Sequence, residues 1–201
     1  MVLRTIALTL AGFLSGSLMF SAWLVRLRGK DIREFGDGNP GAVNAFKACG
    51  PGIGIPALVL DFLKGAVPVW LASHAFGVEG FWLVPVALAP VLGHAFSPFT
   101  RFRGGKAVTA TFGVWAGLTL WEGPTVLGLL LALGRLVQKT DVWTLVFGML
   151  GLLAWWLARG ARPELPVVLV GVLTVLLWKH RHELRTLPRF RRWLGGKEKS
   201  G

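Results

Sequence analysis

The chain has 201 residues, of which 53% are hydrophobic and only 16% are charged, and its mean hydropathy is +0.58. This composition excludes an ordinary soluble domain and indicates a protein embedded in a membrane. The net charge is +12, but the basic residues stand at the ends of apolar runs and not on one soluble face. Lipid head groups and phosphorylated small molecules are therefore the expected partners, and nucleic acid is not.

Seven apolar runs predict membrane-spanning helices, because a span needs about 20 mostly apolar residues. The fourth and fifth runs are short, and Gly123 and Pro124 between them argue against one long helix. Pro124 suits a first helical turn, where its missing N–H would have no partner. The runs cover residues 3–26, 53–76, 80–99, 107–121, 123–138, 141–159 and 164–179. We predict an all-α integral membrane protein, a bundle of seven transmembrane helices that forms a single domain over residues 1–201.

The distribution of Lys and Arg among the connections predicts the orientation of this bundle. The first, third and fifth connections are rich in basic residues, the second and fourth have none, and the sixth has only Arg159 and Arg162. Because basic connections stay in the cytoplasm, we expect the N-terminus outside and the C-terminus in the cytoplasm. The tail, residues 185–201, alternates basic and apolar residues and is predicted to lie on the membrane surface as an amphipathic segment.

Glycine and amide side chains gather in the first connection, which belongs to the predicted cytoplasmic face. A glycine-rich loop can bring its backbone N–H groups close to an anion, because no Cβ stands in the way. Such glycines also serve simply to turn the chain between helices, and for this loop alone the two interpretations are equally good. The residues concerned are Gly36, Gly38, Asn39, Gly41 and Asn44.

Two further loops on the same predicted face carry similar residues. Gly104, Gly105 and Lys106 stand directly before a span, so the N–H groups of a helix start and the Lys106 ammonium would point at one phosphate. The other loop, residues 179–183, follows the last span and contains His180. Two glycine-rich loops and a basic one on a single face favour an anion site over simple turns.

Taken together, these segments resemble the PlsY family of bacterial, membrane-embedded glycerol-3-phosphate acyltransferases. The resemblance covers almost the full length and implies seven transmembrane helices in the inner (plasma) membrane, with the active site facing the cytoplasm. It also implies transfer of a fatty acyl group from acyl phosphate to the 1-hydroxyl of glycerol 3-phosphate, without a metal or cofactor. The enzyme that supplies acyl phosphate is then a candidate partner. The segments are Gly16-Ser17, Asp31-Ile32-Arg33, residues 36–44, residues 61–65, residues 93–96, residues 102–106 and His180-Arg181.

The chemistry and the resemblance together give a set of candidate site residues. Two phosphate-bearing substrates require clustered cations and N–H donors beside an apolar groove. Lys106 is expected to contact phosphate, and His180 to donate a hydrogen bond to phosphate or to assist proton movement. The candidates are Asp37, Asn39, Lys106 and His180 for catalysis, and Arg33, Gly38, Gly41, Asn44, His94, Arg103, Gly104 and Gly105 for substrate binding.

Several positions depart from the family pattern. Asp37 stands where the family usually has Ser, and an ionised carboxylate there repels phosphate. We expect Asp37 to form an ion pair with a neighbouring arginine, the alternative being a base for the acceptor hydroxyl. Val43 replaces a Thr, residues 138–141 lack an expected Ser, and His180-Arg181-His182-Glu183 replaces the more usual His-Arg-Glu/x-Asn pattern. These changes keep open the alternative of a catalytically impaired relative that binds phosphorylated lipid precursors or scaffolds lipid-synthesis enzymes. A transporter is disfavoured, because no internal repeat is present.

Two ionisable residues, Asp61 and Lys64, lie within the second apolar run. They are three residues apart and therefore share one helix face. Ionisable groups inside a membrane are expensive and usually functional. We predict a buried ion pair that orients the site, with direct substrate contact as the alternative.

Overall fold

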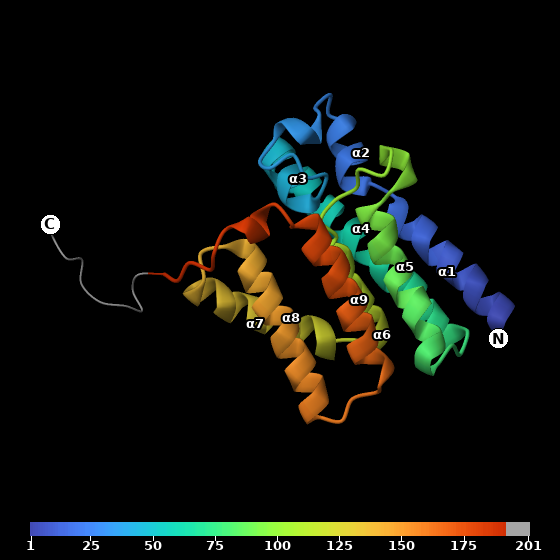
Figure 1. Cartoon of the computed structure of the whole chain (residues 1–201). Coiled ribbons are helices and arrows are strands. Elements are labelled where there is room, and N and C mark those ends of the chain that lie inside the picture. Colours follow the sequence, from blue (N-terminus) through green and yellow to red (C-terminus); the bar gives the residue numbers. More distant parts are fainter. Residues whose placement is uncertain (192–201) are drawn as a thin grey trace, which may run out of the picture.

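The computed structural model describes residues 1–191, and this part of the chain is built from helices (Figure 1). A π-helical turn, Leu71–Ala75, continues α4, and short 3-10 turns occupy several connections. The α-helices are α1 Val2–Ser17, α2 Phe20–Arg26, α3 Ala42–Cys49, α4 Pro51–Trp70, α5 Leu83–Ala95, α6 Val108–Thr119, α7 Glu122–Val137, α8 Asp141–Ala158 and α9 Glu164–Lys179.

Four helical segments of the described chain are long and apolar enough to cross a membrane: Val2–Arg26, Pro51–Ala75, Gly80–Thr100 and Asp141–Ala158. Val108–Thr119 is also apolar but shorter. The division between the fourth and fifth predicted spans is present, because α6 ends at Thr119 and α7 starts at Glu122. Pro124 accordingly lies in the first turn of α7, as predicted.

Small residues let two pairs of helices approach closely, α1 with α5 and α4 with α6. A Cβ on Gly93 of α5 would lie 2.2 Å from the carbonyl oxygen of Phe13, and one on Gly113 of α6 would lie 2.1 Å from that of Phe62. In a bilayer the lipid tails are as apolar as the side chains, so such backbone contact through glycine is a main source of helix association.

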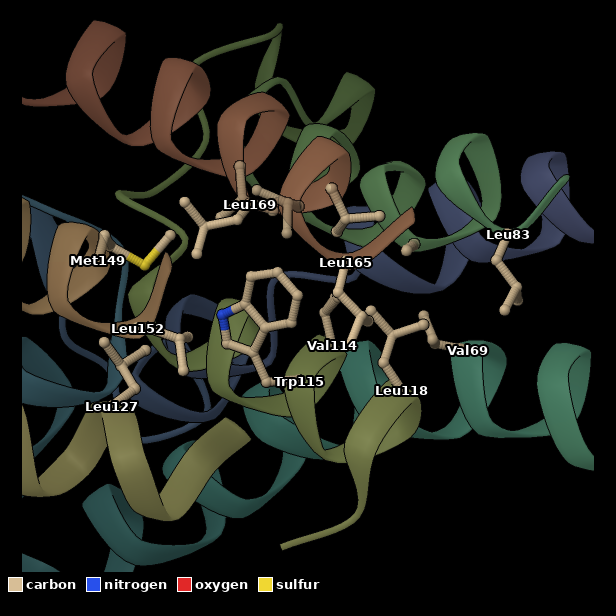
Figure 2. Close-up of a cluster of buried hydrophobic side chains, with 14 of the residues drawn as sticks. Val69, Leu83, Val114, Trp115, Leu118, Leu127, Met149, Leu152, Leu165 and Leu169 are labelled. Atoms are coloured by element: carbon tan, nitrogen blue, oxygen red, sulfur yellow. The ribbon is translucent and has the colours of Figure 1, made fainter. Parts of the chain in front are cut away.

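The largest apolar cluster surrounds Trp115 of α6, which is fully buried (Figure 2). Its ring meets that of Trp156 from α8 edge to face, with 4.8 Å between centroids, a favourable arrangement for two aromatic rings. Leu127 of α7, Met149 of α8 and Leu169 of α9 pack into the same cluster. This core joins α6, α7, α8 and α9 and fixes where the carboxyl end of α9 emerges.

The first predicted span, residues 3–26, is not one continuous helix. It is broken between α1 and α2, where Leu18 takes an extended conformation. The Lys64 ammonium reaches across from α4 and donates to the Leu18 carbonyl at 2.5 Å. The Ser97 hydroxyl donates to the Ser17 carbonyl at 2.7 Å. These partners replace the helical hydrogen bonds of the two carbonyls, so the break costs little.

The first connection and the start of the tail contain structure that the apolar runs do not predict. The connection contains a helix, α3, whose alanines pack against Val25 and Ile32. In the tail, residues 186–191 are not helical but lie against the fifth connection, where the Lys139 N–H donates to the Arg189 carbonyl at 2.8 Å. The amphipathic segment predicted for residues 185–201 remains a prediction, and residues 192–201 lie outside the described part of the chain.

Candidate functional site

Three loops that are distant in sequence meet at one end of the helical bundle. Figure 1 shows the carboxyl end of α9 reaching the region occupied by α2 and α3. There the Lys106 ammonium lies 2.6 Å from the Asp37 carboxylate and 2.5 Å from the Glu183 carboxylate. The Lys106 backbone N–H donates to the side-chain oxygen of Asn39 at 3.0 Å. Lys106 therefore connects all three loops through its own atoms.

The first loop folds around the side chain of Asn44, which is 2% exposed. Its amide donates to the Asp37 carboxylate at 2.8 Å and to the Asn39 carbonyl at 2.9 Å. Gly36 has a positive φ of 61°, and a Cβ there would lie 2.1 Å from the Asn44 side-chain oxygen. Glycine is required at this position for both reasons.

Three of the glycine N–H groups that the sequence suggests for an anion cradle are instead bonded to backbone carbonyls. The N–H of Gly38 donates to the Phe35 carbonyl, and that of Gly41 to the Asn39 carbonyl. In the second loop the Gly105 N–H donates to the His94 carbonyl. Because these three N–H groups, like that of Lys106, already have partners, the cationic side chains are the more readily available anion-binding groups.

The second loop packs tightly on the end of α5. A Cβ on Gly104 would lie 2.0 Å from the His94 carbonyl oxygen, and one on Gly105 would lie 2.3 Å from the His94 ring. His94 itself is 3% exposed. Gly104 and Gly105 therefore let the loop lie directly over a buried histidine, which places Lys106 beside the first loop.

Lys179, the last residue of α9, fixes the second loop from the other side. Its ammonium donates to the carbonyls of Ala95 and Gly104, both at 2.9 Å, and lies 5.5 Å from the centre of the Phe96 ring. A cation at a helix end that satisfies free carbonyls is a favourable cap. Here the cap holds α5, α9 and the second loop together.

The charges of the site are strongly coupled. Burial by itself would raise the pKa of Asp37, but hydrogen bonds from Lys106, Asn44 and the Asn39 N–H outweigh it and hold this pKa at about 2. Burial likewise opposes the charge of Lys106, yet Asp37 and Glu183 raise its pKa above the usual value. Asp37 and Lys106 are therefore both ionised at neutral pH. The predicted ion pair of Asp37 is present, but its partner is a lysine and not an arginine, and so low a pKa makes Asp37 a poor base.

His180 lies next to this cluster, just beyond the end of α9, and is 6% exposed. Its Nδ1 is 2.8 Å from the Leu176 carbonyl, so that nitrogen carries the proton of the neutral ring and Nε2 is left as an acceptor. Burial lowers the pKa of His180, although the Leu176 carbonyl and the Glu183 carboxylate partly oppose this effect. The ring is therefore neutral at physiological pH.

An open groove of about 510 Å³ lies beside the lysine. Seven of the predicted site residues line it: Arg33, Asp37, Gly38, Asn39, Arg103, Gly104 and Lys106. The other five do not line it: Gly41, Asn44, His94, Gly105 and His180. The aromatic rings of Phe96, Phe102 and Trp178 complete its wall. A groove that combines cations with aromatic rings suits a substrate that bears both a phosphate and an alkyl chain.

The ion pair predicted in the second apolar run is present and buried. The Lys64 ammonium lies 2.7 Å from the Asp61 carboxylate, and both side chains are 1% exposed. The Ser21 hydroxyl donates to the other carboxylate oxygen at 2.5 Å. Neither side chain lines the groove, so the pair acts by joining α4 to the break between α1 and α2.

Two residues of the cluster were absent from the sequence-based candidates, Lys179 and Glu183. Lys179 is the last residue of α9, and Glu183 is the first residue of the 3-10 turn that follows. Their charge could have identified them from the sequence, because each adds an ionisable group to the loop that was already selected for His180.

A chain with several apolar helices, and with lysine, arginine and amide side chains gathered around a groove at one end, is a membrane protein with a site for anionic substrates. The chain belongs to the glycerol-3-phosphate acyltransferase family, whose sequence model matches residues 6–189. It is therefore an acyltransferase, and the family predicted from the sequence is confirmed.

Named relatives and solved structures agree with this family assignment. Glycerol-3-phosphate acyltransferase 1 of Thermotoga maritima is 38% identical over 187 residues, covering 86% of this chain and 92% of the relative. The enzyme of the same name from Deinococcus radiodurans is 36% identical and covers 93% of each chain. The crystal structure of PlsY, an integral membrane glycerol 3-phosphate acyltransferase, in its glycerol 3-phosphate form superposes with a TM-score of 0.82, at 26% identity over 95% of this chain and 92% of that one. None of these supports a catalytically impaired binding protein.

Proposed function

We propose that the protein transfers a fatty acyl group from acyl phosphate to the 1-hydroxyl of sn-glycerol 3-phosphate, giving lysophosphatidic acid and inorganic phosphate. The observation that carries this proposal is the meeting of Asn39, Lys106 and Glu183, from three separate loops, beside a groove with cationic and aromatic walls. The names of the relatives support glycerol 3-phosphate as acceptor.

The reaction asks mainly for alignment and charge neutralisation, because acyl phosphate is already activated. The acceptor oxygen forms a bond to the acyl carbon, the bond from that carbon to the phosphate oxygen breaks, and phosphate leaves with the electron pair. Lys106, with Arg33 and Arg103 on the groove wall, would neutralise the phosphates. Fixed cations that meet charge as it develops are an effective source of rate enhancement.

The remaining residues take distinct proposed roles. Asn39 would orient substrate oxygens, and Nε2 of neutral His180 would accept the hydroxyl proton. Asn44, His94, Gly41 and Gly105 would act as positioning residues, because they do not line the groove. Gly38 and Gly104 would line the substrate path. We infer no metal or cofactor.

The proposed setting is the inner membrane of a bacterium. Seven spans would form one membrane-embedded domain, with the amino end outside and the groove and carboxyl end on the cytoplasmic side. The basic first, third and fifth connections support this orientation. The enzyme that supplies acyl phosphate would then reach the groove from the cytoplasm.

A direct assay tests the proposal. Purified full-length protein is incubated with palmitoyl phosphate and labelled glycerol 3-phosphate, and labelled lysophosphatidic acid is measured. We expect product that depends on both substrates, with stoichiometric phosphate release. Product formed equally well from acyl-coenzyme A would contradict the proposed donor, and no product from any donor would contradict the proposed activity.

Replacing Asp37 with Ser is expected to lower the KM for glycerol 3-phosphate about tenfold while kcat changes little. The carboxylate holds the Lys106 ammonium in an ion pair, and an incoming phosphate has to compete with it for a charge-assisted contact. Steady-state kinetics at neutral pH check this result. Asp141→Ser, which removes an exposed carboxylate paired with Arg135, is the matched control. Turnover in the Asp37→Ser variant alone, with none in the native chain, would mean that the carboxylate blocks the reaction.

The acyl transfer rate is expected to decline below about pH 6.5 and to stay level above it. Burial lowers the pKa of His180, so its proton-accepting form is complete at neutral pH and is lost only on acidification. Asp37, with a pKa of about 2, adds no step in this range. The measurement is kcat against pH for the native protein, His180→Asn and the exposed neighbour variant His182→Asn. His180→Asn should be slower and lose the acidic decline that His182→Asn keeps, whereas an unchanged profile would exclude His180 as the proton acceptor.

A further inference from the structure

A second groove, of about 740 Å³, adjoins the first on the side of α2. It is formed by the end of α2, the loop that follows, and the segment after α5, which Figure 1 shows beside α2. Arg33, Pro40 and Arg103 line both grooves, so the two share a wall. The activity proposed above uses the first groove and, of the second groove's lining, only the shared Arg33 and Arg103; it assigns nothing to Arg26, Arg101, Trp23 and Phe99.

The second groove has an excess of positive charge that the protein leaves unpaired. Its lining contains five cationic side chains against a single carboxylate, that of Asp31. Lys30 is engaged, because its ammonium donates to the Ala48 carbonyl at 2.6 Å. The guanidinium groups of the other four make no hydrogen bond or ion pair with any residue among positions 1–191; they belong to Arg26, Arg33, Arg101 and Arg103. Four guanidinium groups around one cavity are suited to a phosphate, which accepts several of their N–H bonds at once.

One side of the same groove is apolar and exposed. Trp23 and Phe99 meet edge to face with 6.0 Å between ring centroids, and they remain 39% and 56% exposed. Trp23 and Arg26 lie at the end of the long apolar segment Val2–Arg26. Trp and Arg at this position mark the boundary between the hydrocarbon and the head groups. A soluble phosphate would leave these rings uncovered, whereas a lipid would bring its acyl chain against them.

We propose that the second groove binds an anionic phospholipid of the surrounding bilayer, with the head-group phosphate among Arg26, Arg33, Arg101 and Arg103 and the acyl chain beside Trp23 and Phe99. The site recognises a phosphate joined to an alkyl chain and carrying no compensating positive charge. A zwitterionic head group is disfavoured, because its ammonium would enter a cavity that is already cationic.

Native mass spectrometry of the purified full-length protein tests this site. The protein is titrated in a neutral detergent with dioleoylphosphatidylglycerol or dioleoylphosphatidylcholine. We expect one phosphatidylglycerol retained at least tenfold more tightly than phosphatidylcholine, and retention unaffected by 10-fold molar excess of inorganic phosphate over lipid. Equal retention of the two lipids would overturn the proposal. Displacement by inorganic phosphate would show instead that the groove is a site for soluble phosphate.

A pair of double variants with the same change in charge separates the groove from general attraction to the surface. Arg26→Gln/Arg101→Gln removes two arginines that line only the second groove. Arg28→Gln/Arg185→Gln removes two exposed arginines outside both grooves. We expect the first to lose at least tenfold in phosphatidylglycerol affinity and the second to resemble the native protein. Equal losses would overturn the proposal. If a variant folds poorly, the comparison of phosphatidylglycerol with phosphatidylcholine on the native protein still tests whether the site prefers an anionic phospholipid.

Discussion

Lys106→Ala is expected to lower kcat/KM for acyl transfer about a hundred- to a thousandfold, the usual cost of removing one preorganised charge-stabilising donor. The variant loses the ammonium that would neutralise phosphate and leaves the Asp37 and Glu183 carboxylates facing each other without a cation between them. The measurement is initial rate against glycerol 3-phosphate concentration, with palmitoyl phosphate fixed.

Two further variants show whether the loss of rate is specific to Lys106 and to its positive charge. Lys139→Ala removes an exposed lysine outside both grooves and should retain native kinetics. Lys106→Arg keeps the charge and should recover part of the rate, since a guanidinium also contacts carboxylate and phosphate but with a different shape. Native turnover in Lys106→Ala would remove the central phosphate contact of the proposed site.

Lys64→Met is expected to destabilise the folded protein by about 3–5 kcal/mol, because it leaves the Asp61 carboxylate buried without its partner cation. The Leu18 carbonyl also loses its bond from the Lys64 ammonium, which removes the group that stabilises the break between α1 and α2. Equilibrium unfolding in mixed detergent micelles measures this change, with Lys139→Met as the exposed control.

The double variant Lys64→Met/Asp61→Asn distinguishes loss of the ion pair from loss of packing. With both charges removed, much of the stability should return, since a missing pair costs far less than a single unpaired charge. Full stability with abolished activity in Lys64→Met would instead favour the alternative considered from the sequence, in which Lys64 contacts substrate directly.

The sequence predicted those parts of the fold that depend on local composition. Apolar runs marked the helices, and Gly123 with Pro124 correctly separated α6 from α7, because both residues act on their own segment. The break after Ser17 depends on Lys64, 46 residues away along the chain from Leu18. Apolar periodicity carries no trace of such a contact, so residues 3–26 were predicted as one helix.

In the site too, features set by local sequence could be predicted, whereas those that depend on contacts between distant segments could not. Asn39, Gly105 and Lys106 could be selected from their own loops, and the structure brings them together. The ion partner of Asp37 was predicted wrongly, because charge patterns do not reveal which of several nearby cations the fold places within 2.6 Å. The N–H groups of Gly38, Gly41 and Gly105 were expected to face an anion. They donate instead to the Phe35, Asn39 and His94 carbonyls, which depends on loop conformation.

The two hydrogen bonds from Lys179 to the Ala95 and Gly104 carbonyls couple the position of α9 to that of the second loop. The Lys179 ammonium joins the carboxyl end of α9 to the second loop, in which Lys106 follows Gly104 by two residues. A displacement of α9, for example by a protein that binds at its carboxyl end, would therefore also displace Lys106. The position of α9 is thus coupled to that of Lys106, in addition to the packing of α9 in the bundle.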